Sequence, residues 1–268
     1  IPYITSYYKK RWGFCLAHQQ LEQLKPGKYR AVVRSRHFKG VLNYGEWVLP
    51  GKSDREIFLS TYICHPSMAN NELSGPVVAT ALARWVKSIP NRKYTYRLVF
   101  IPETIGSLVY LSMNLNHLQQ QVDAGFNISC VGDNRVYSYL PSRNGSTIAD
   151  QVAQHVLQHI DAEYNRYTWL DRGSDERQYC SPGVDLPVAS ICRSKYGEYP
   201  EYHTSLDNLE LISPRGLQGA LHALQMACES LENNEILKVA VKGEPQLGKR
   251  GLYPDLSIKG STGLVRVM

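Results

Sequence analysis

Side chains that could bind a metal ion or transfer a proton follow four of the strands predicted for this chain. Imidazole and carboxylate groups suit Zn²⁺, and a carboxylate that is not a ligand can take a proton from water beside the metal. The residues in question, each placed directly after an apolar run or one loop beyond it, are His65, Glu103, Asp133 and His203.

Each of these residues also has an ordinary structural explanation. A histidine after a strand is often hydrogen-bonded within its loop, and an aspartate there often forms a turn. Four such residues after successive strands are a less common coincidence, because in α/β sheets ligands bind beyond the carboxyl ends of the strands. From the spacing alone, a metal site and a set of loop-forming residues both stay open.

The elements that must position these residues alternate between strands and helices. The run 56–63 predicts a buried strand, and 76–89 predicts a helix because its apolar residues fall on one helical face. This alternation predicts an α/β sheet covered on both faces. The further expected strands span 96–101, 125–131 and 188–192, and the further expected helices span 108–122, 147–160 and 214–231.

The two ends of the chain differ from its middle. Short alternating runs at 29–34 and 40–49, separated by turn signals, predict strands and hence a small β-rich subdomain. The last residues are turn-rich and predict a linker toward a further domain. The chain begins with Ile1 rather than methionine, so we expect its natural N-terminus to be missing. The three expected regions are 1–50, 51–235 and 236–268.

The composition excludes several classes of protein. Hydrophobic residues make up 43% of the 268 residues and charged residues 20%, an ordinary globular mixture. No apolar stretch approaches the ~18 residues of a membrane span. The net charge is +6, but the lysines and arginines are too scattered to suggest a nucleic-acid groove. Phosphate-binding glycine motifs are absent, and Ser74 and Ser174 do not complete G-x-S-x-G, so a serine hydrolase is a less supported alternative.

The six cysteines contain no C-x-x-C pair, which excludes a zinc ribbon or a thioredoxin motif. Their even number allows disulfides. However, Cys64 and Cys130 lie in apolar, strand-like runs, and Cys228 lies on a helix face. We therefore expect buried free thiols and a location in the reducing cytoplasm.

The order of the motifs resembles that of the zinc aminopeptidase family, which includes bacterial leucyl aminopeptidases and glutamate carboxypeptidase II. That family has a strand-end histidine, an acidic residue before a Ser-Gly that opens a helix, a Glu-Glu pair, a further acidic residue and a final Tyr-His-Thr-x-x-Asp. The matching positions, which cover about 56–232, are His65, Asn71–Gly75, Glu103–Thr104, Asp133, Ser174–Asp175 and Tyr202–Asp207.

A narrower resemblance is to a bacterial group of aminopeptidase-like proteins that carry a β insertion and a C-terminal winged-helix domain. Some members lie near polysaccharide-biosynthesis genes, which implies a link to that process. The resemblance also implies that residues 1–50 belong to the insertion and that the end of the chain leads into the winged-helix domain. The stretches that carry it are Tyr62–Gly75, Pro102–Ser107 and Arg172–Tyr179.

The resemblance implies a three-layer α/β/α mixed sheet of zinc-aminopeptidase type that holds one Zn²⁺ rather than two. Asn71 and Thr104 stand where the family has two metal-binding carboxylates. Glu72 then replaces a lost carboxylate, and Glu103 keeps the position of the general base. Position 67 is Ser67, where peptidases usually place an aspartate that orients the histidine. The implied zinc ligands are drawn from His65, Glu72, Asp133 and His203.

Two hypotheses follow. The first is a zinc-dependent hydrolase that cleaves an amide bond, at a peptide N-terminus or an N-acyl group, with Glu103 accepting a proton from water. The second is a non-catalytic binding module with the same fold, which Asn71 and Thr104 favour. We expect a small-molecule or peptide substrate and neither membrane nor nucleic-acid binding by this chain, and we leave oligomerisation open. Arginines suit carboxylate or phosphate, although surface ion pairs explain them equally well. The expected substrate contacts are Asn71, Arg172, Asp175, Arg177, Arg193 and Tyr202.

Overall fold

The computed structural model describes residues 11, 13–34, 36, 38–65, 67–235, 237–240, 242–243 and 246–251. The chain divides into two units, Ile1–Asn233 and Asn234–Met268. Among the described residues of the second unit, the one regular element is the short 3-10 helix η3 (Gly248–Arg250). The elements discussed below all belong to the first unit.

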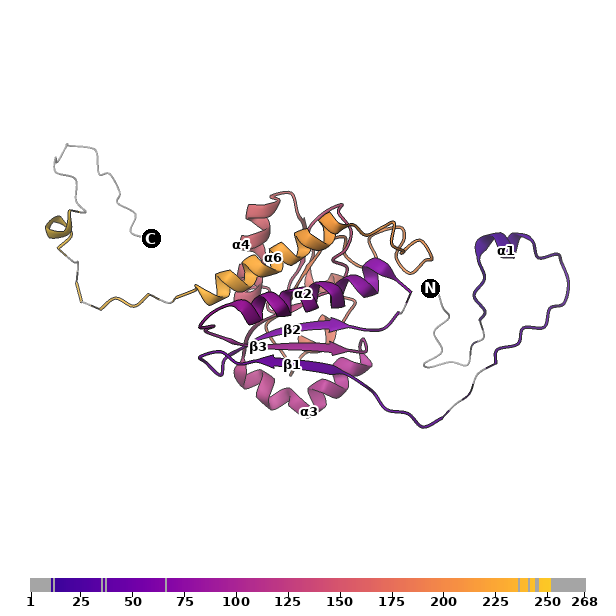
Figure 1. The fold of residues 1–268 in the computed structure, drawn as a ribbon, viewed down its shortest axis with the longest axis horizontal. Helices are drawn as coiled ribbons and strands as arrows, with labels where there is room; N and C mark the ends of the chain where they lie inside the picture. Colours follow the sequence, from indigo (N-terminus) through magenta and orange to yellow (C-terminus); the bar gives the residue numbers. More distant parts are fainter. Residues whose placement is uncertain are drawn as a thin grey trace. The chain divides into compact units, whose positions relative to one another are not determined.

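Seven strands of the described residues form one mixed sheet (Figure 1). They are β1 (Gly45–Leu49), β2 (Glu56–Tyr62), β3 (Thr95–Ile101), β4 (Val122–Asn127), β5 (Ser138–Leu140), β6 (Asn165–Arg166) and β7 (Val188–Cys192). Their order in the sheet is β1-β3-β2-β4-β7-β5-β6. Strands β3, β2, β4 and β7 run parallel to one another, whereas β1 and β5 pair antiparallel with β3 and β7.

Helices cover both faces of the sheet. In Figure 1, α2 and α6 lie on one side of the strands and α3 lies on the other. The helical elements of this unit are α1 (His18–Glu22), the π-helical turn η1 (Ala69–Leu73), α2 (Ser74–Ser88), α3 (Ile105–Gln121), α4 (Ile148–Ile160), the 3-10 turn η2 (Trp169–Asp171), α5 (Glu176–Tyr179) and α6 (Pro214–Glu232). The predicted three-layer α/β/α arrangement with a mixed sheet is therefore confirmed.

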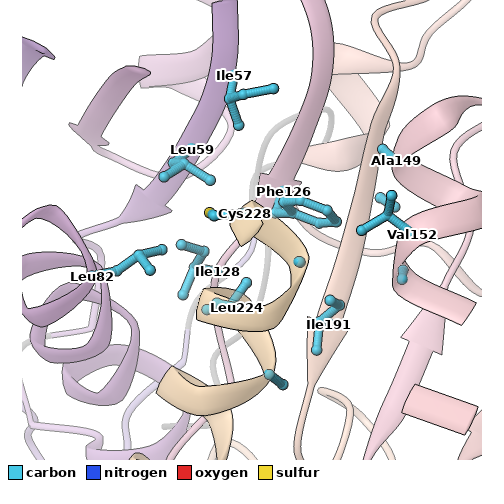
Figure 2. Close-up of a cluster of buried hydrophobic side chains, with 14 of the residues drawn as sticks. Ile57, Leu59, Leu82, Phe126, Ile128, Ala149, Val152, Ile191, Leu224 and Cys228 are labelled. Atoms are coloured by element: carbon cyan, nitrogen blue, oxygen red, sulfur yellow. The ribbon is translucent and has the colours of Figure 1, made fainter. Parts of the chain in front are cut away.

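The central strand β2 is buried on both faces because its side chains alternate between two apolar clusters. Ile57 and Leu59 point into the cluster formed with α2, α4 and α6, where Leu82 also lies (Figure 2). Phe58, between them, packs in the opposite cluster and stacks on Tyr110 of α3. This double burial explains why Ile57, Phe58 and Leu59 are consecutive apolar residues that do not alternate with polar ones.

The connections between the parallel strands leave an opening at one edge of the sheet. The chain passes from β2 through α2 to β3 on one side of β2. It then passes through α3 to β4, which pairs with β2 on the other side. At such a change of direction the loops after the strands separate, and a crevice forms beyond their carboxyl ends. His65 and Glu103 follow β2 and β3 at this edge.

Most of the predicted elements of the central region are confirmed. Strands β2, β3 and β7 and helices α4 and α6 lie within two residues of their expected bounds, and α3 begins three residues earlier. The predicted strand 29–34 is wrong, since those residues form no strand. Of 40–49, only β1 is a strand, and it joins the main sheet by pairing with β3. A short alternating run becomes a strand only where a partner strand lies beside it. Residues 1–10 lie outside the described residues.

The cysteines agree only in part with expectation. All six lie in the described part of the chain and none forms a disulfide. Cys130, Cys180, Cys192 and Cys228 are buried, but Cys64 lies beyond the end of β2 and is exposed. Among the residues that the structure describes, no helix combines the length and the apolar composition needed to cross a membrane.

The start of α6 lies against the backbone that follows β4. Ser213 caps this helix by accepting a hydrogen bond from the N–H of Gly216 at 3.0 Å. A Cβ atom added to Gly216 would overlap the carbonyl oxygens of Gly132 and Asp133. Glycine is therefore needed here for close approach of two backbones, and this approach fixes the loop that carries Asp133.

We expect the substitution Gly216→Ala to lower the free energy of unfolding of the chain by roughly 1–3 kcal/mol, because backbone carbonyls cannot move aside for a methyl group. The higher helix propensity of alanine offsets only about 1 kcal/mol of this loss. Urea unfolding measures the change. The control is Gln218→Ala, at an exposed position of the same helix, which should change stability by about 0.5 kcal/mol or less. An unchanged or increased midpoint for Gly216→Ala would contradict the proposed close approach.

Candidate functional site

Three side chains near the end of β2 form the group best suited to a metal ion in the described part of the chain. Cys64 and His65 follow β2, and Glu72 lies in η1. One ligand atom of each lies within 4.8 Å of the others. The Nδ1 atom of His65 is 3.4 Å from Oε2 of Glu72. Thiolate, imidazole and carboxylate are the three side-chain groups that bind Zn²⁺ in proteins.

Two of the candidate ligand atoms in this group lack a hydrogen-bond partner among the residues that the structure describes. Within the described residues, neither His65 Nδ1 nor Glu72 Oε2 has a hydrogen-bond partner, although both atoms are buried. The other oxygen of Glu72 accepts a hydrogen bond from the backbone N–H of Cys64. Two ligands about 2.1 Å from a tetrahedral metal ion lie about 3.4 Å apart, which is the separation found here. The residues present therefore fit a bound divalent cation.

Burial changes the acidity of these groups. It raises the pKa of the Glu72 carboxyl to about 7 and lowers the pKa of the His65 imidazole. Cys64 is exposed as a residue, but partial desolvation of its thiol raises the pKa to about 12, with a further contribution from the charges of Glu103 and Glu72. Desolvation disfavours every charged form. The neutral imidazole is the form that binds a metal, and a bound cation would favour the ionised thiol and carboxyl.

Glu103 reaches this group from the end of β3. Its carboxylate accepts a hydrogen bond from the Ser174 hydroxyl at 3.0 Å and another from the Cys64 thiol. Burial raises the pKa of Glu103, while these two hydrogen bonds oppose the rise. Glu103 is half-buried. The predicted general base thus lies beside a candidate ligand and does not belong to the ligand group itself.

A strained turn sets the position of Glu103. Thr104 has φ +62° and ψ −64°, and the N–H of Ile105 donates to the carbonyl of Glu103 at 2.7 Å. This is a γ-turn, a rare conformation that is costly for a β-branched residue. The buried carboxylate of Asp175 holds it by accepting hydrogen bonds from the Thr104 N–H at 2.7 Å and from the Ser107 hydroxyl at 2.9 Å. Asp175, which we expected to contact substrate, supports this turn.

His203 lies beside the group without being part of it. Its ring centroid is 4.7 Å from that of His65. The Tyr202 ring stacks on the His203 ring, with 4.0 Å between the two centroids. Its nitrogens do not belong to the described group of close ligand atoms. His203 also has a left-handed backbone, with φ +56°. Burial and the neighbouring His65 lower the pKa of this imidazole. The structure therefore brings together both predicted histidines, Glu72, Glu103 and Tyr202.

The loop that carries His203 is fastened by Asp207. The Asp207 carboxylate accepts hydrogen bonds from the backbone N–H groups of Asn70 at 2.6 Å and Asn71 at 3.1 Å, at the start of η1. The side-chain oxygen of Asn70 in turn accepts from the N–H groups that follow β4, at 2.8 Å from Gly132. These residues are buried. Loops from three parts of the chain are thus tied into one unit.

Asp133 does not join the ligand group. Its two carboxylate oxygens accept four hydrogen bonds: from the Ser194 hydroxyl and N–H at 2.8 and 2.9 Å, from the Arg135 N–H at 3.0 Å and from the Asn70 amide at 3.1 Å. All of its principal acceptor positions are occupied by the protein. Asp133 is thus a buried hydrogen-bond acceptor in the loop after β4, and we do not propose it as a zinc ligand.

The predicted substrate contacts are dispersed. Asn71 is buried, and its amide donates to the Tyr62 hydroxyl at 2.9 Å. Arg172 is exposed and donates to the carbonyl of Trp169 in its own loop at 3.1 Å. Arg177 is close enough to Glu103 for its charge to lower the pKa of that carboxyl. Arg193 is buried and lines a separate cleft. Of the three arginines, Arg177 alone is electrostatically coupled to the candidate site in this way.

Two residues of the site were missed by the sequence prediction. Cys64 directly precedes His65, and its position at a strand end was the available signal, but its apolar neighbours suggested a buried thiol. Asn70 showed no signal of its own. Its role depends on the backbone of Gly132, which only the folded chain brings near.

Comparison with known proteins identifies the regions of the chain. Residues 19–234 match the family described as "Domain of unknown function (DUF4910)". Residues 1–36 match another domain of unknown function, DUF2172. Residues 234–268 match a winged helix-turn-helix, the type of domain expected toward the end of the chain.

A curated protein of Clostridium acetobutylicum is 42% identical over 254 residues. Its name assigns it provisionally to polysaccharide biosynthesis and gives it an aminopeptidase-like domain. The match covers 94% of this chain and 58% of that relative. A crystal structure from the same organism, provisionally described as a peptidase, is 41% identical with a TM-score of 0.82, covering 93% of this chain and 59% of the other. The chain thus spans a little over half the length of these relatives.

A zinc aminopeptidase from Bacillus subtilis has the same fold. It is 21% identical, with a TM-score of 0.53, and the match covers 70% of this chain and 48% of that enzyme. At this level of identity the likeness concerns the fold alone. The protein has an aminopeptidase-like α/β fold, and because the DUF4910 match covers most of the chain, it belongs to the family described as domain of unknown function DUF4910.

Proposed function

We propose that this protein is a zinc-dependent hydrolase of the aminopeptidase type that cleaves an amide bond with a single zinc ion. One observation carries the proposal: the unpartnered atoms His65 Nδ1 and Glu72 Oε2 lie 3.4 Å apart at the end of β2. The fold, which the protein shares with a named zinc aminopeptidase, supports it further. Resemblance to glutamate carboxypeptidase II rests on the order of the motifs only.

The residues that would hold zinc are His65, Glu72 and Cys64, with His203 beside them. A bound zinc ion supplies Lewis acidity, which polarises a carbonyl group and lowers the pKa of water toward ~7. The neutral side chains at positions 71 and 104 argue for one ion. The amide nitrogen of Asn71 donates to Tyr62, its neutral oxygen is a poor bridge between two cations, and Thr104 occupies the strained turn.

Glu103 is the proposed general base. Its carboxylate accepts a proton from the attacking water and later donates it to the leaving amine. The Ser174 hydroxyl at 3.0 Å orients the carboxylate, and the γ-turn at Thr104 fixes the direction of the side chain. Asp175 is a positioning residue in this scheme, because it holds the turn and contacts no reacting atom.

The proposed substrate is a peptide N-terminus or an N-acylated small molecule. Arg177 supplies positive charge near Glu103, and Tyr202 supplies an aromatic surface beside His203. The name of the relative from Clostridium acetobutylicum favours a link to polysaccharide biosynthesis, and hence an N-acyl amino sugar as the first substrate to test. The cytoplasmic location, expected from the cysteines, stays a prediction.

A non-catalytic module is the second candidate. Asn71 and Thr104 favour it, since each replaces a carboxylate of the zinc aminopeptidases and each has a structural role here. The two functions differ in turnover. Purified protein is therefore tested for release of free amine from aminoacyl and N-acyl substrates, with zinc content determined on the same sample. Bound zinc without turnover across both substrate classes would favour the module.

Elemental analysis after dialysis should give one zinc per chain. We expect Cys64→Ser to weaken zinc binding by ~10-fold or more, the usual result of losing a ligand or its support. The matched control is Cys15→Ser, at the other exposed cysteine, which should keep the zinc affinity of the parent protein. Two zinc ions per chain, or equal affinities in the two variants, would contradict the proposed mononuclear site.

We expect Glu103→Gln to keep the fold and the zinc ion and to reduce turnover by ~10²–10⁴-fold, the typical contribution of general acid–base catalysis. The amide preserves volume and removes only the charge that accepts a proton. Glu210→Gln, at an exposed position, is the control. Zinc loss together with activity would make Glu103 a ligand, whereas full activity would move the chemistry to another residue.

The substitution His203→Asn tests the role of the imidazole ring while the left-handed backbone is kept. Asparagine tolerates the left-handed backbone of this position better than most residues, so the fold should persist. We expect zinc affinity or turnover to fall by ~10-fold or more, because an imidazole ring that lies against His65 is lost. Circular dichroism checks the fold, and zinc titration and amine release check the effect. Parent-like values for both would leave His203 with a structural role only.

A further inference from the structure

A second polar cleft lies away from the proposed zinc ligands, with a volume of about 550 Å³. It is formed by the loop after β4, the end of β7 and the first turns of α6. None of the residues proposed to bind zinc lines it. Its volume falls in the range of small-molecule sites, roughly 300–1,000 Å³. The residues on which the argument rests are Arg135, Tyr137, Asp161, Arg193, Arg215 and Gln218.

Arg193 is the unusual residue of this cleft. It is 4% exposed, and its guanidinium lies over the Tyr137 ring at 3.7 Å. Its Nε atom donates to the carbonyl of Asp133 at 2.9 Å, and one Nη atom donates to the side-chain oxygen of Asn134 at 3.2 Å. Both partners are neutral, and no carboxylate within the described residues forms an ion pair with it. A buried charge without a counterion is costly.

The remaining nitrogen of Arg193 is available to a ligand. Nη1 makes no hydrogen bond within the described part of the chain, and it lies beside Gly219, where a Cβ atom would be 3.3 Å away. The absence of a side chain at Gly219 therefore keeps the space in front of this nitrogen open. Gly219 itself lines the cleft. The structure thus directs an unpaired donor of a buried cation into a polar cavity.

The other charges of the cleft add to this positive centre. Arg215 is exposed at the start of α6 and forms no ion pair among the described residues. Arg135 is already paired with Glu201 through two hydrogen bonds of 2.8 Å. Asp161 is the one acidic residue of the lining. Two arginines, one of them buried, therefore lack an anionic partner.

We propose that this cleft binds the phosphoryl group of a small phosphorylated molecule. Arg193 directly follows β7 and Arg215 lies in α6, so donors approach from separate parts of the fold. A tetrahedral phosphate offers acceptors in several directions, whereas the acceptors of a carboxylate lie in one plane. The cavity is larger than a phosphate ion, and Tyr137, Asp161 and Gln218 provide surfaces for an organic part. This inference does not depend on the proposed hydrolase activity.

Isothermal titration of the full chain with ribose 5-phosphate and with inorganic phosphate, at equal ionic strength, tests the proposal. We expect saturable binding of one ribose 5-phosphate per chain. Arg215→Gln and Gln218→Glu, both at exposed positions, should each weaken it by roughly tenfold or more. The first removes a charge-assisted hydrogen bond, and the second places a negative charge beside the phosphate. Arg84→Gln, an exposed arginine of α2, is the control and should bind as the parent does.

The outcomes separate the ligand sources and the two sites. Tighter binding of the ester than of inorganic phosphate supports a phosphorylated metabolite, and equal affinities support a phosphate ion on the same donors. Cys64→Ser should bind both probes like the parent protein, whereas a probe held by the zinc ion would bind more weakly to that variant. No saturable binding of either probe, or parent-like binding by both cleft variants, overturns the proposal.

Discussion

The hydrogen bonds of the Asp207 carboxylate to the start of η1 hold the two segments of the candidate site together. His65 and Glu72 lie on one short segment after β2, whereas His203 lies on a loop much later in the chain, and neither segment is a strand. Asp207 joins the His203 loop to the N–H groups of Asn70 and Asn71. An ionised acceptor makes these bonds stronger than bonds between neutral groups, and burial excludes water as a competitor.

The sheet fixes the positions of the loops that these hydrogen bonds join. Because β2 is buried on both faces, α2 and α3 are held on opposite sides, and the loops after β2 and β3 open at one edge. Close approach of backbones is needed on the same edge. A side chain on Gly75 would collide with Thr61 and with the carbonyl of Ile128, as one on Gly216 would with the loop after β4. Small residues therefore let two helix starts lie directly against strand ends.

The parts of the fold that could be predicted are those whose pattern of apolar residues extends over a whole strand or helix. The strand β2 has consecutive apolar residues at 57–59, and α6 has one apolar face. A histidine or glutamate that follows such a strand can be placed from sequence. The two- and three-residue strands β6 and β5 carry too few residues for a pattern. The strand expected at 29–34 had the pattern but no partner. Local alternation cannot show whether a neighbouring strand exists.

The details of the candidate site depended on contacts that are distant in sequence. Glu72 lies beside His65, and its role as a ligand stays a prediction. Asp133 was proposed as a ligand from its position after a strand, which does not show that Ser194 and Asn70 occupy its carboxylate. The γ-turn at Thr104 was also hidden, because threonine is a poor residue for it and Asp175 alone explains its presence. Hydrogen-bond saturation and backbone strain are properties of the folded chain.

The hydrogen bonds of Asp207 and Asn70 are formed within the chain and need no metal ion. The loops are therefore ordered before a cation binds. A site preorganised in this way loses little conformational entropy on binding. It differs from a zinc finger, in which metal binding and folding are one event. Chelation would then leave a folded apoprotein that can be reloaded. The choice of metal would follow from the thiol, imidazole and carboxylate donors, which favour zinc over magnesium or calcium, and from the supply of ions in the cell.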